Sequence, residues 1–132
     1  MKNIPTIAGA LLGLAFITFG LNHFLHFIPM GGGPPEGSPP ALFFAAIVPT
    51  GFLTFVKICE ILGGILVSIP KTRNLGLLVL GPIVVNILAF NILIAGGSAV
   101  FQAPVIAVSL LSAYLLWHGR EAFGGLVNAS SK

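Results

Sequence analysis

The sequence contains very few charged residues. Six Lys or Arg and three Asp or Glu occur among 132 residues, so 7% of the chain is charged, whereas a typical soluble domain has about 25%. So few charges cannot cover a surface that faces water on all sides, which excludes an ordinary soluble domain. The length also leaves no room for a separate soluble catalytic domain beside the apolar segments.

The sequence also lacks the residues and motifs of several enzyme classes. Cys59 is the only cysteine, which excludes an internal disulfide, a dithiol exchange centre and a thiolate metal site. The chain has no phosphate-binding loop, nucleophile elbow, zinc-protease helix or dinucleotide fingerprint. We therefore expect neither a stand-alone hydrolase nor a kinase.

What the chain has instead is four long apolar stretches, at about residues 4–28, 41–69, 75–94 and 99–117. A helix rises about 1.5 Å per residue, so about 20 apolar residues cross a hydrocarbon core of roughly 30 Å. The sequence predicts one all-α domain over residues 1–132 that spans a membrane four times. Because its connections are short, the spans should form an up-down four-helix bundle.

The second apolar stretch is too long for one straight span, and Pro49 interrupts it. Proline disrupts a helix at and before its own position. The sequence therefore predicts a short interfacial helix at about residues 41–48, followed by the second span at about residues 51–69. Dense Pro and Gly between residues 29 and 40 should end the preceding helix.

Small residues indicate where the predicted helices approach one another closely. Gly9 and Gly13 form a small-xxx-small face on the first span, and Gly63 and Gly64 with Ser68 form a second such surface. We interpret these positions as packing seams rather than as ligand contacts.

The positively charged residues indicate how the spans are oriented. Five of them fall on one side of the predicted topology: Lys2, Lys71, Arg73, Arg120 and Lys132. By the positive-inside rule, both termini are cytoplasmic in a multi-pass protein of the cell membrane. This distribution is a topological signal, so we expect no nucleic-acid partner. The tail after Arg120 is expected to be short and frayed.

Polar residues inside the predicted spans gather in the outer half of the bundle. They form the candidate polar pocket, which consists of Asn22, His23, His26, Lys57, Glu60, Asn86, Asn91 and Gln102. Polar residues in a membrane interior are costly, and they usually pair or face a cavity. These eight residues are therefore the candidate ligand-binding site.

Lys57 and Glu60 are three residues apart, so they share a helix face and can pair directly. One interpretation is a self-neutralising pair that only stabilises the bundle. The other is that Glu60 lies at the floor of a polar pocket and binds or moves protons. The sequence leaves both open, together with the protonation state of Glu60.

The other polar residues allow fewer interpretations. His23 and His26 lack a third metal ligand apart from Glu60, and no histidine faces them from an opposed helix for haem, so we expect no metal site. They either hydrogen-bond with the outer loop or contact the polar headgroup of a small molecule or quinone. Asn86 and Asn91 are expected to form hydrogen bonds between helices rather than to bind a ligand.

Several segments of the chain resemble the DoxX family. They are FGLNHFLHFIPM at residues 19–30, TGFL at 50–53, KICEILGGIL at 57–66 and GPIVVNI at 81–87. The resemblance covers residues 7–94, and the last span matches only as an apolar segment. Members of this family are small four-helix membrane proteins, and the family is named after a subunit of a thiosulfate:quinone oxidoreductase.

The resemblance implies a shared polar core of Asn22, Lys57, Glu60 and Asn86. Related sequences often carry a histidine where this chain has Asn91, which removes a titratable group and weakens a proton-relay or metal function. Relatives in thiol exchange are expected to carry cysteine pairs, so the single cysteine of this chain argues against that branch.

From these patterns we expect an accessory or scaffold subunit that is linked to a membrane redox process and has no catalytic activity of its own. Any activity would belong to an oxidoreductase complex, and a quinone is the one cofactor that the resemblance suggests. The expected partners are the lipid bilayer and either an oxidoreductase subunit or further copies of the chain. The alternative is a small oligomeric transporter or channel component that uses the Lys57–Glu60 pair, because interrupted helices often line substrate paths.

Overall fold

The computed structural model describes residues 3–27, 33–97 and 102–130. Regular structure in these ranges is helical throughout. The α-helices are α1 (Ile4–Leu25), α2 (Pro39–Ile47), α3 (Phe52–Ser68), α4 (Arg73–Ala89), α5 (Ala103–His118) and α6 (Arg120–Ser130). A 3₁₀ turn, η1 (Pro70–Thr72), precedes α4, and a π-helix, η2 (Phe90–Ile94), continues it.

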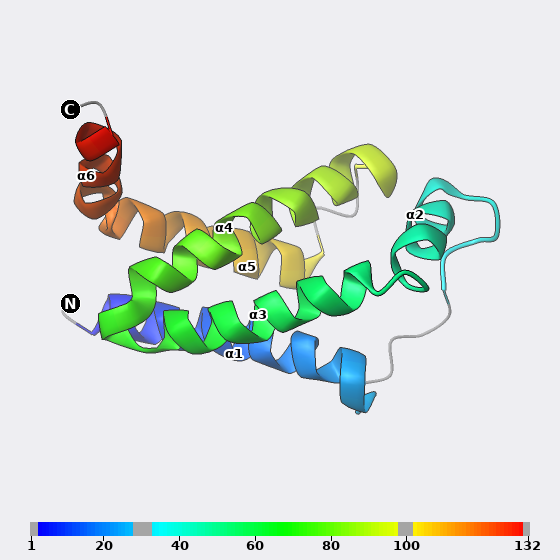
Figure 1. Cartoon of the computed structure of the whole chain (residues 1–132), viewed down its shortest axis with the longest axis horizontal. Helices are drawn as coiled ribbons and strands as arrows, with labels where there is room; N and C mark the ends of the chain where they lie inside the picture. Colours follow the sequence, from blue (N-terminus) through cyan, green and yellow to red (C-terminus); the bar gives the residue numbers. More distant parts are fainter. Residues whose placement is uncertain (1–2, 28–32, 98–101, 131–132) are drawn as a thin grey trace.

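The four longest helices run side by side along the molecule (Figure 1). Helix α1 packs on α3 and α5, and α4 packs on the same two helices from the other side. Consecutive long helices run in opposite directions, so the N-terminus, the α3–α4 turn and the α5–α6 junction lie at one end. Helix α2 and η2 lie at the opposite end.

Local sequence signals fix the start of α2 and the break between α2 and α3. Pro39 and Pro40 occupy the first turn of α2, and the hydroxyl of Ser38 accepts a hydrogen bond from the Ala41 amide at 3.4 Å. Residues 48–51 form the turn at the Pro49 interruption, where Gly51 has φ 83°. Helices α2 and α3 meet there at 84°.

The helices carry apolar side chains outside as well as inside. The core contains Leu12, Val67, Leu80 and Leu115, each almost fully buried, yet Leu93 and Leu110 are 79% and 66% exposed. A helix that is hydrophobic all round belongs in a protein core or a membrane. The exposed apolar surface therefore suits a lipid bilayer and indicates a membrane protein.

Helix length separates the membrane-spanning candidates among the described residues. The α1 helix and the continuous segment Pro70–Ile94 are each long and apolar enough to cross a membrane, and the bent pair α2–α3 would make a third crossing. Helix α5 is apolar but has 16 residues. The structure thus supports two or three spans by length and composition.

Close contact between α1 and α3 depends on glycine, which confirms the predicted seams. A Cβ atom on Gly9 would lie 2.7 Å from the Val67 carbonyl oxygen, and one on Gly64 would lie 2.9 Å from the Gly13 oxygen. A Cβ on Gly13 would overlap the Ser68 hydroxyl, which donates to the Gly64 carbonyl at 2.7 Å. Helices can approach this closely only where the side chains are this small.

The structure corrects the expectation for the C-terminal tail, which is helical as α6 rather than frayed. It turns sharply away from the end of α5 (Figure 1), and Phe123 packs against the core. Burying this ring offsets the entropy that the tail loses on ordering. Residue 28 of the first expected span, residues 29–32 of its connection, residues 99–101 of the last span, and Lys2 and Lys132 lie outside the described residues.

Candidate functional site

A cavity of about 750 Å³ lies at the end of the bundle that carries α2. Helices α1, α2, α3, α4 and α5 and the π-helix η2 all contribute side chains to its wall. Five of the predicted site residues line it: Lys57, Glu60, Asn86, Asn91 and Gln102. The fold thus brings together polar side chains from three segments that are distant in the sequence.

Lys57 and Glu60 form an ion pair at this cavity. The Lys57 Nζ lies 3.3 Å from the Glu60 Oε1, and the two side chains are 22% and 7% exposed. Their spacing on α3 brings them onto one face, which confirms that they pair directly. An ammonium group has three N–H donors, so Lys57 retains donors for a further acceptor beside its contact with Glu60.

The two asparagines of the α4–η2 segment correct the prediction of interhelical hydrogen bonds. Asn86 Nδ2 donates to the Pro82 carbonyl at 2.9 Å, and Asn91 Nδ2 donates to the Ile87 carbonyl at 2.7 Å. Each acceptor lies four residues earlier on the same helical segment. An asparagine side chain can hydrogen-bond to the carbonyl one turn earlier as easily as to a neighbouring helix. The position of an asparagine in the sequence does not show which of these bonds it makes.

The π-helix η2 shapes one wall of the cavity. The Ala95 amide donates to the Phe90 carbonyl five residues earlier at 2.8 Å, which is the hydrogen bond that defines a π-turn. Phe90, Asn91, Leu93 and Ile94 of this short segment all line the cavity. Such π segments are frequent at functional sites.

Three residues of the predicted site do not line the cavity. Asn22 is buried in α1 at 5% exposure. His23 Nε2 lies 3.1 Å from the Thr54 hydroxyl and thereby links α1 to α3. His26 is exposed and ends α1 in the left-handed conformation, with φ 52°. The cavity is therefore built without these histidines.

Aromatic residues that sequence reasoning did not single out close much of the site. The rings of Phe43 and Phe44 on α2 lie 5.0 and 5.5 Å from the ring of Phe90 on η2, between centroids. Phe16, Phe19 and Phe52 add further rings to the lining. Two adjacent phenylalanines in a short helix bounded by prolines are a signal in the sequence, but the residue that they contact lies 46 positions beyond Phe44.

In the described part of the chain, no three His, Cys, Asp or Glu side chains come together closely enough to hold a metal ion. The polar groups that line the cavity are one ion pair and three side-chain amides, and the rest of the lining is apolar. Such a site can hold an amphipathic molecule whose polar group meets Lys57 and Glu60 while its apolar part follows the phenylalanine rings.

Comparison with known protein families, curated proteins and solved structures finds no match to this chain.

Proposed function

We propose that the chain is a DoxX-like accessory subunit of a membrane redox system, and that its cavity binds the headgroup of a lipid-soluble quinone. The observation that carries this proposal is the cavity of about 750 Å³, whose wall holds the Lys57–Glu60 pair and three side-chain amides and is otherwise aromatic and aliphatic. The volume falls within the range of roughly 300–1,000 Å³ that is usual for small-molecule sites. The protein would hold the quinone for a partner oxidoreductase.

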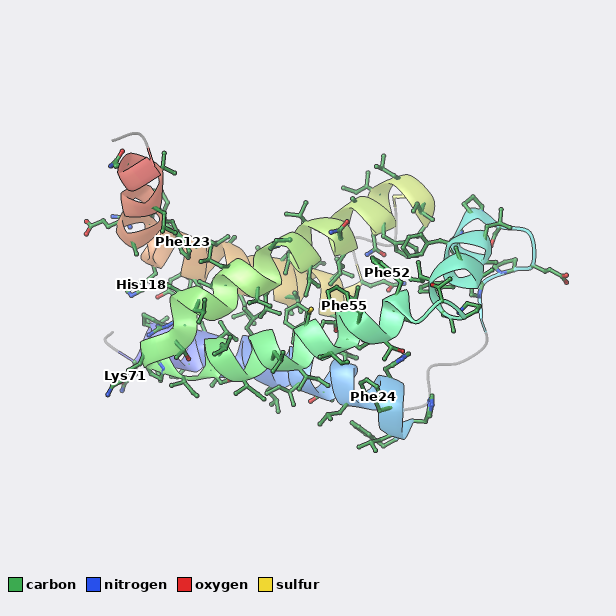
Figure 2. The ribbon with its side chains drawn as sticks, in the orientation of Figure 1. Phe24, Phe52, Phe55, Lys71, His118 and Phe123 are labelled. Atoms are coloured by element: carbon green, nitrogen blue, oxygen red, sulfur yellow. The ribbon has the colours of Figure 1, made fainter. Side chains whose placement is uncertain are left out.

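The membrane placement in this proposal comprises four spans with both termini in the cytoplasm. Helix α5, with its 16 residues, is about 24 Å long, and a short span is accommodated by local thinning of the bilayer. The α2–α3 pair supplies another crossing in which α2 lies near the outer interface. Lys71 lies at the same end of the bundle as the N-terminus and the α5–α6 junction (Figure 2), which agrees with the positive-inside rule.

The donors around the cavity match the acceptors of a quinone ring. Lys57 retains N–H donors beyond its contact with Glu60, and Gln102, the N-cap residue of α5, makes no side-chain capping bond. Quinone carbonyl oxygens accept hydrogen bonds from such groups. The rings of Phe43, Phe44 and Phe90 offer faces for stacking, and the polyprenyl tail would leave between the helices toward lipid.

Direct binding tests the proposal. The full chain in lipid nanodiscs is titrated with decylubiquinone by calorimetry, and we expect saturable binding at one site. Glu60→Gln should weaken it about tenfold or more, because the ammonium of Lys57 loses its counter-charge and the site reorganises. His26→Ala is the matched control, since His26 lies outside the cavity. Absence of saturable binding by the wild type would refute the quinone assignment.

The second candidate is an oligomeric transporter or channel component. It is favoured by the 84° bend between α2 and α3 directly before the Lys57–Glu60 pair, because interrupted helices often line substrate paths. Four helices are few for a pathway, so this function requires several copies of the chain. Proton flux into liposomes that is present in the wild type and lost in Glu60→Gln would support the transport function. Absence of flux in the wild type would exclude it.

A further inference from the structure

Helix α6 turns across the long axis of the bundle, at the end that also carries the N-terminus (Figure 1), and no function discussed above uses it. A single residue, Gly119, separates it from α5. The amides of Ala122 and Phe123 both donate to the Gly119 carbonyl, at 3.0 and 3.2 Å. The turn is therefore hydrogen-bonded, and it fixes the direction in which α6 leaves α5.

The two sides of α6 differ in polarity. Phe123, Leu126 and Val127 are spaced by three and four residues, so they share one side of the helix. We call these three residues the apolar side of α6. Each residue turns a helix by about 100°, which places Glu121 and Asn128 on the opposite side. Leu126 and Val127 are 53% and 69% exposed, so the fold itself covers only part of the apolar side.

The apolar side of α6 is the side that faces the bundle. Phe123 packs against the core, and a Cβ atom on Gly119 would lie 3.3 Å from its ring. Figure 2 shows Phe123 at this junction. Helix α6 has 11 residues, which corresponds to about 16 Å, and it extends past the ends of the long helices (Figure 1). Leu126 and Val127 therefore face the layer in which the long helices lie.

Residues at the end of α5 indicate the level at which α6 begins. Trp117 is 65% exposed, and the Arg120 guanidinium lies 4.4 Å from the centre of its ring. Arg120 Nη1 also donates to the Trp117 carbonyl at 2.9 Å. Exposed tryptophan is typical of the boundary between hydrocarbon and lipid headgroups, where arginine keeps its charged group in the polar layer. The first turn of α6 thus lies at this boundary.

We propose that α6 lies in the plane of the membrane–water interface, with Leu126 and Val127 among the lipid acyl chains and Glu121 and Asn128 in water. The surface of the bilayer, rather than another protein, covers the apolar side. Amphipathic helices of this kind bury their apolar side about 5–10 Å into the boundary between headgroups and acyl chains. The inference rests on the membrane placement proposed above and is independent of what the cavity at the other end binds.

The accessibility of spin labels tests this position. In a Cys59→Ser background, which has no other cysteine, a nitroxide is attached at Leu126→Cys or at Asn128→Cys, and the chain is reconstituted in phosphatidylcholine liposomes. Oxygen reports contact with lipid, and nickel ethylenediaminediacetate reports contact with water. The ratio of oxygen to nickel accessibility should be about threefold or more higher at Leu126→Cys, because that side of the helix lies among acyl chains.

Leu110→Cys is the control for the membrane placement, since Leu110 is 66% exposed in the middle of α5. A label there that favours nickel would refute the placement of the long helices and this inference with it. If the Leu110→Cys label lies in lipid, equal ratios at Leu126→Cys and Asn128→Cys would overturn the position of α6 alone. A Leu126→Cys label shielded from both reagents would overturn it in favour of a contact with another protein chain.

The native tryptophan provides a second test that needs no substitution. Trp117 is the only tryptophan of the chain, so tryptophan fluorescence reports its depth. Phospholipids brominated close to the headgroup should quench this fluorescence more strongly than phospholipids brominated near the ends of the acyl chains, because Trp117 lies at the boundary. Stronger quenching by the deeper bromines would place the start of α6 inside the hydrocarbon and overturn the proposed position.

Discussion

The Nζ of Lys57 lies 3.3 Å from the Oε1 of Glu60, one turn further along α3, and both side chains line the same cavity. The carboxylate is the more deeply buried partner, at 7% exposure against 22% for the lysine. A charge that loses its partner in a poorly hydrated site is strongly unfavourable, whereas removing both charges need not be.

Glu60→Leu alone should therefore destabilise the protein more than the double variant Lys57→Leu with Glu60→Leu. We expect the single variant to lose up to about 3–5 kcal/mol, since Lys57 remains without its partner. The double variant should recover at least half of that loss. Unfolding by sodium dodecyl sulfate in mixed micelles measures both, and a double variant as unstable as the single one would contradict the stabilising role of the pair.

Gly13→Ala should separate α1 from α3. The added methyl group would overlap the Ser68 hydroxyl and approach the Gly64 carbonyl, and overpacking of this kind costs about 1–3 kcal/mol. The loss appears as a lower midpoint of thermal unfolding in detergent.

Gly124→Ala is the matched control for this prediction. A Cβ atom at Gly124 of α6 meets nothing within 4 Å, and alanine is a better helix former than glycine by about 0.5–1 kcal/mol. The control should be neutral or slightly stabilising. Equal losses for both variants would show that the close approach of α1 and α3 is not what makes Gly13 important.

Phe90→Ala should weaken quinone binding more than it weakens the fold. The Phe90 ring contacts Phe43 and Phe44 at the cavity, and aromatic pairs contribute about 0.5–1.5 kcal/mol beyond the area they bury. We expect a loss of about threefold to tenfold in decylubiquinone affinity. Phe55→Ala is the control, because Phe55 is 61% exposed on α3 and does not line the cavity. Equal effects of the two variants would contradict this role of Phe90.

Single-cysteine labelling should reveal the orientation. In a Cys59→Ser background the chain has no other cysteine, so Glu36→Cys and Lys71→Cys each carry one reactive thiol at an exposed position. With a membrane-impermeant maleimide on intact cells, we expect labelling of Glu36→Cys and labelling of Lys71→Cys only after lysis. The reverse pattern would place the termini outside the cell.

Several features followed from the sequence because they depend on neighbours along the chain. Hydropathy placed the apolar helices, the Pro49 interruption separated α2 from α3, and the spacing of Lys57 and Glu60 put both on one face. The glycine seams followed for the same reason, since residues four apart on a helix form a continuous surface. Each of these properties is local.

Other features depend on contacts between segments that are distant in the sequence, and the sequence pattern does not show which segments meet. The tail after Arg120 is helical, and Phe123 packs against the core. Asn86 and Asn91 donate hydrogen bonds within their own helical segment rather than to another helix. Both outcomes depend on which surface is within reach once the helices pack. Hydropathy alone carries no information about that.

The sequence by itself determined an apolar, helical chain with the Lys57–Glu60 pair on one helix face, because helix formation and the spacing of side chains along a helix depend on a few neighbouring residues. Only the tertiary structure decided that Asn22, His23 and His26 lie away from the cavity while the phenylalanines of α2 and η2 help to close it. A cavity exists between helices, so its walls are selected by how whole helices pack against one another and not by the pattern within any one of them.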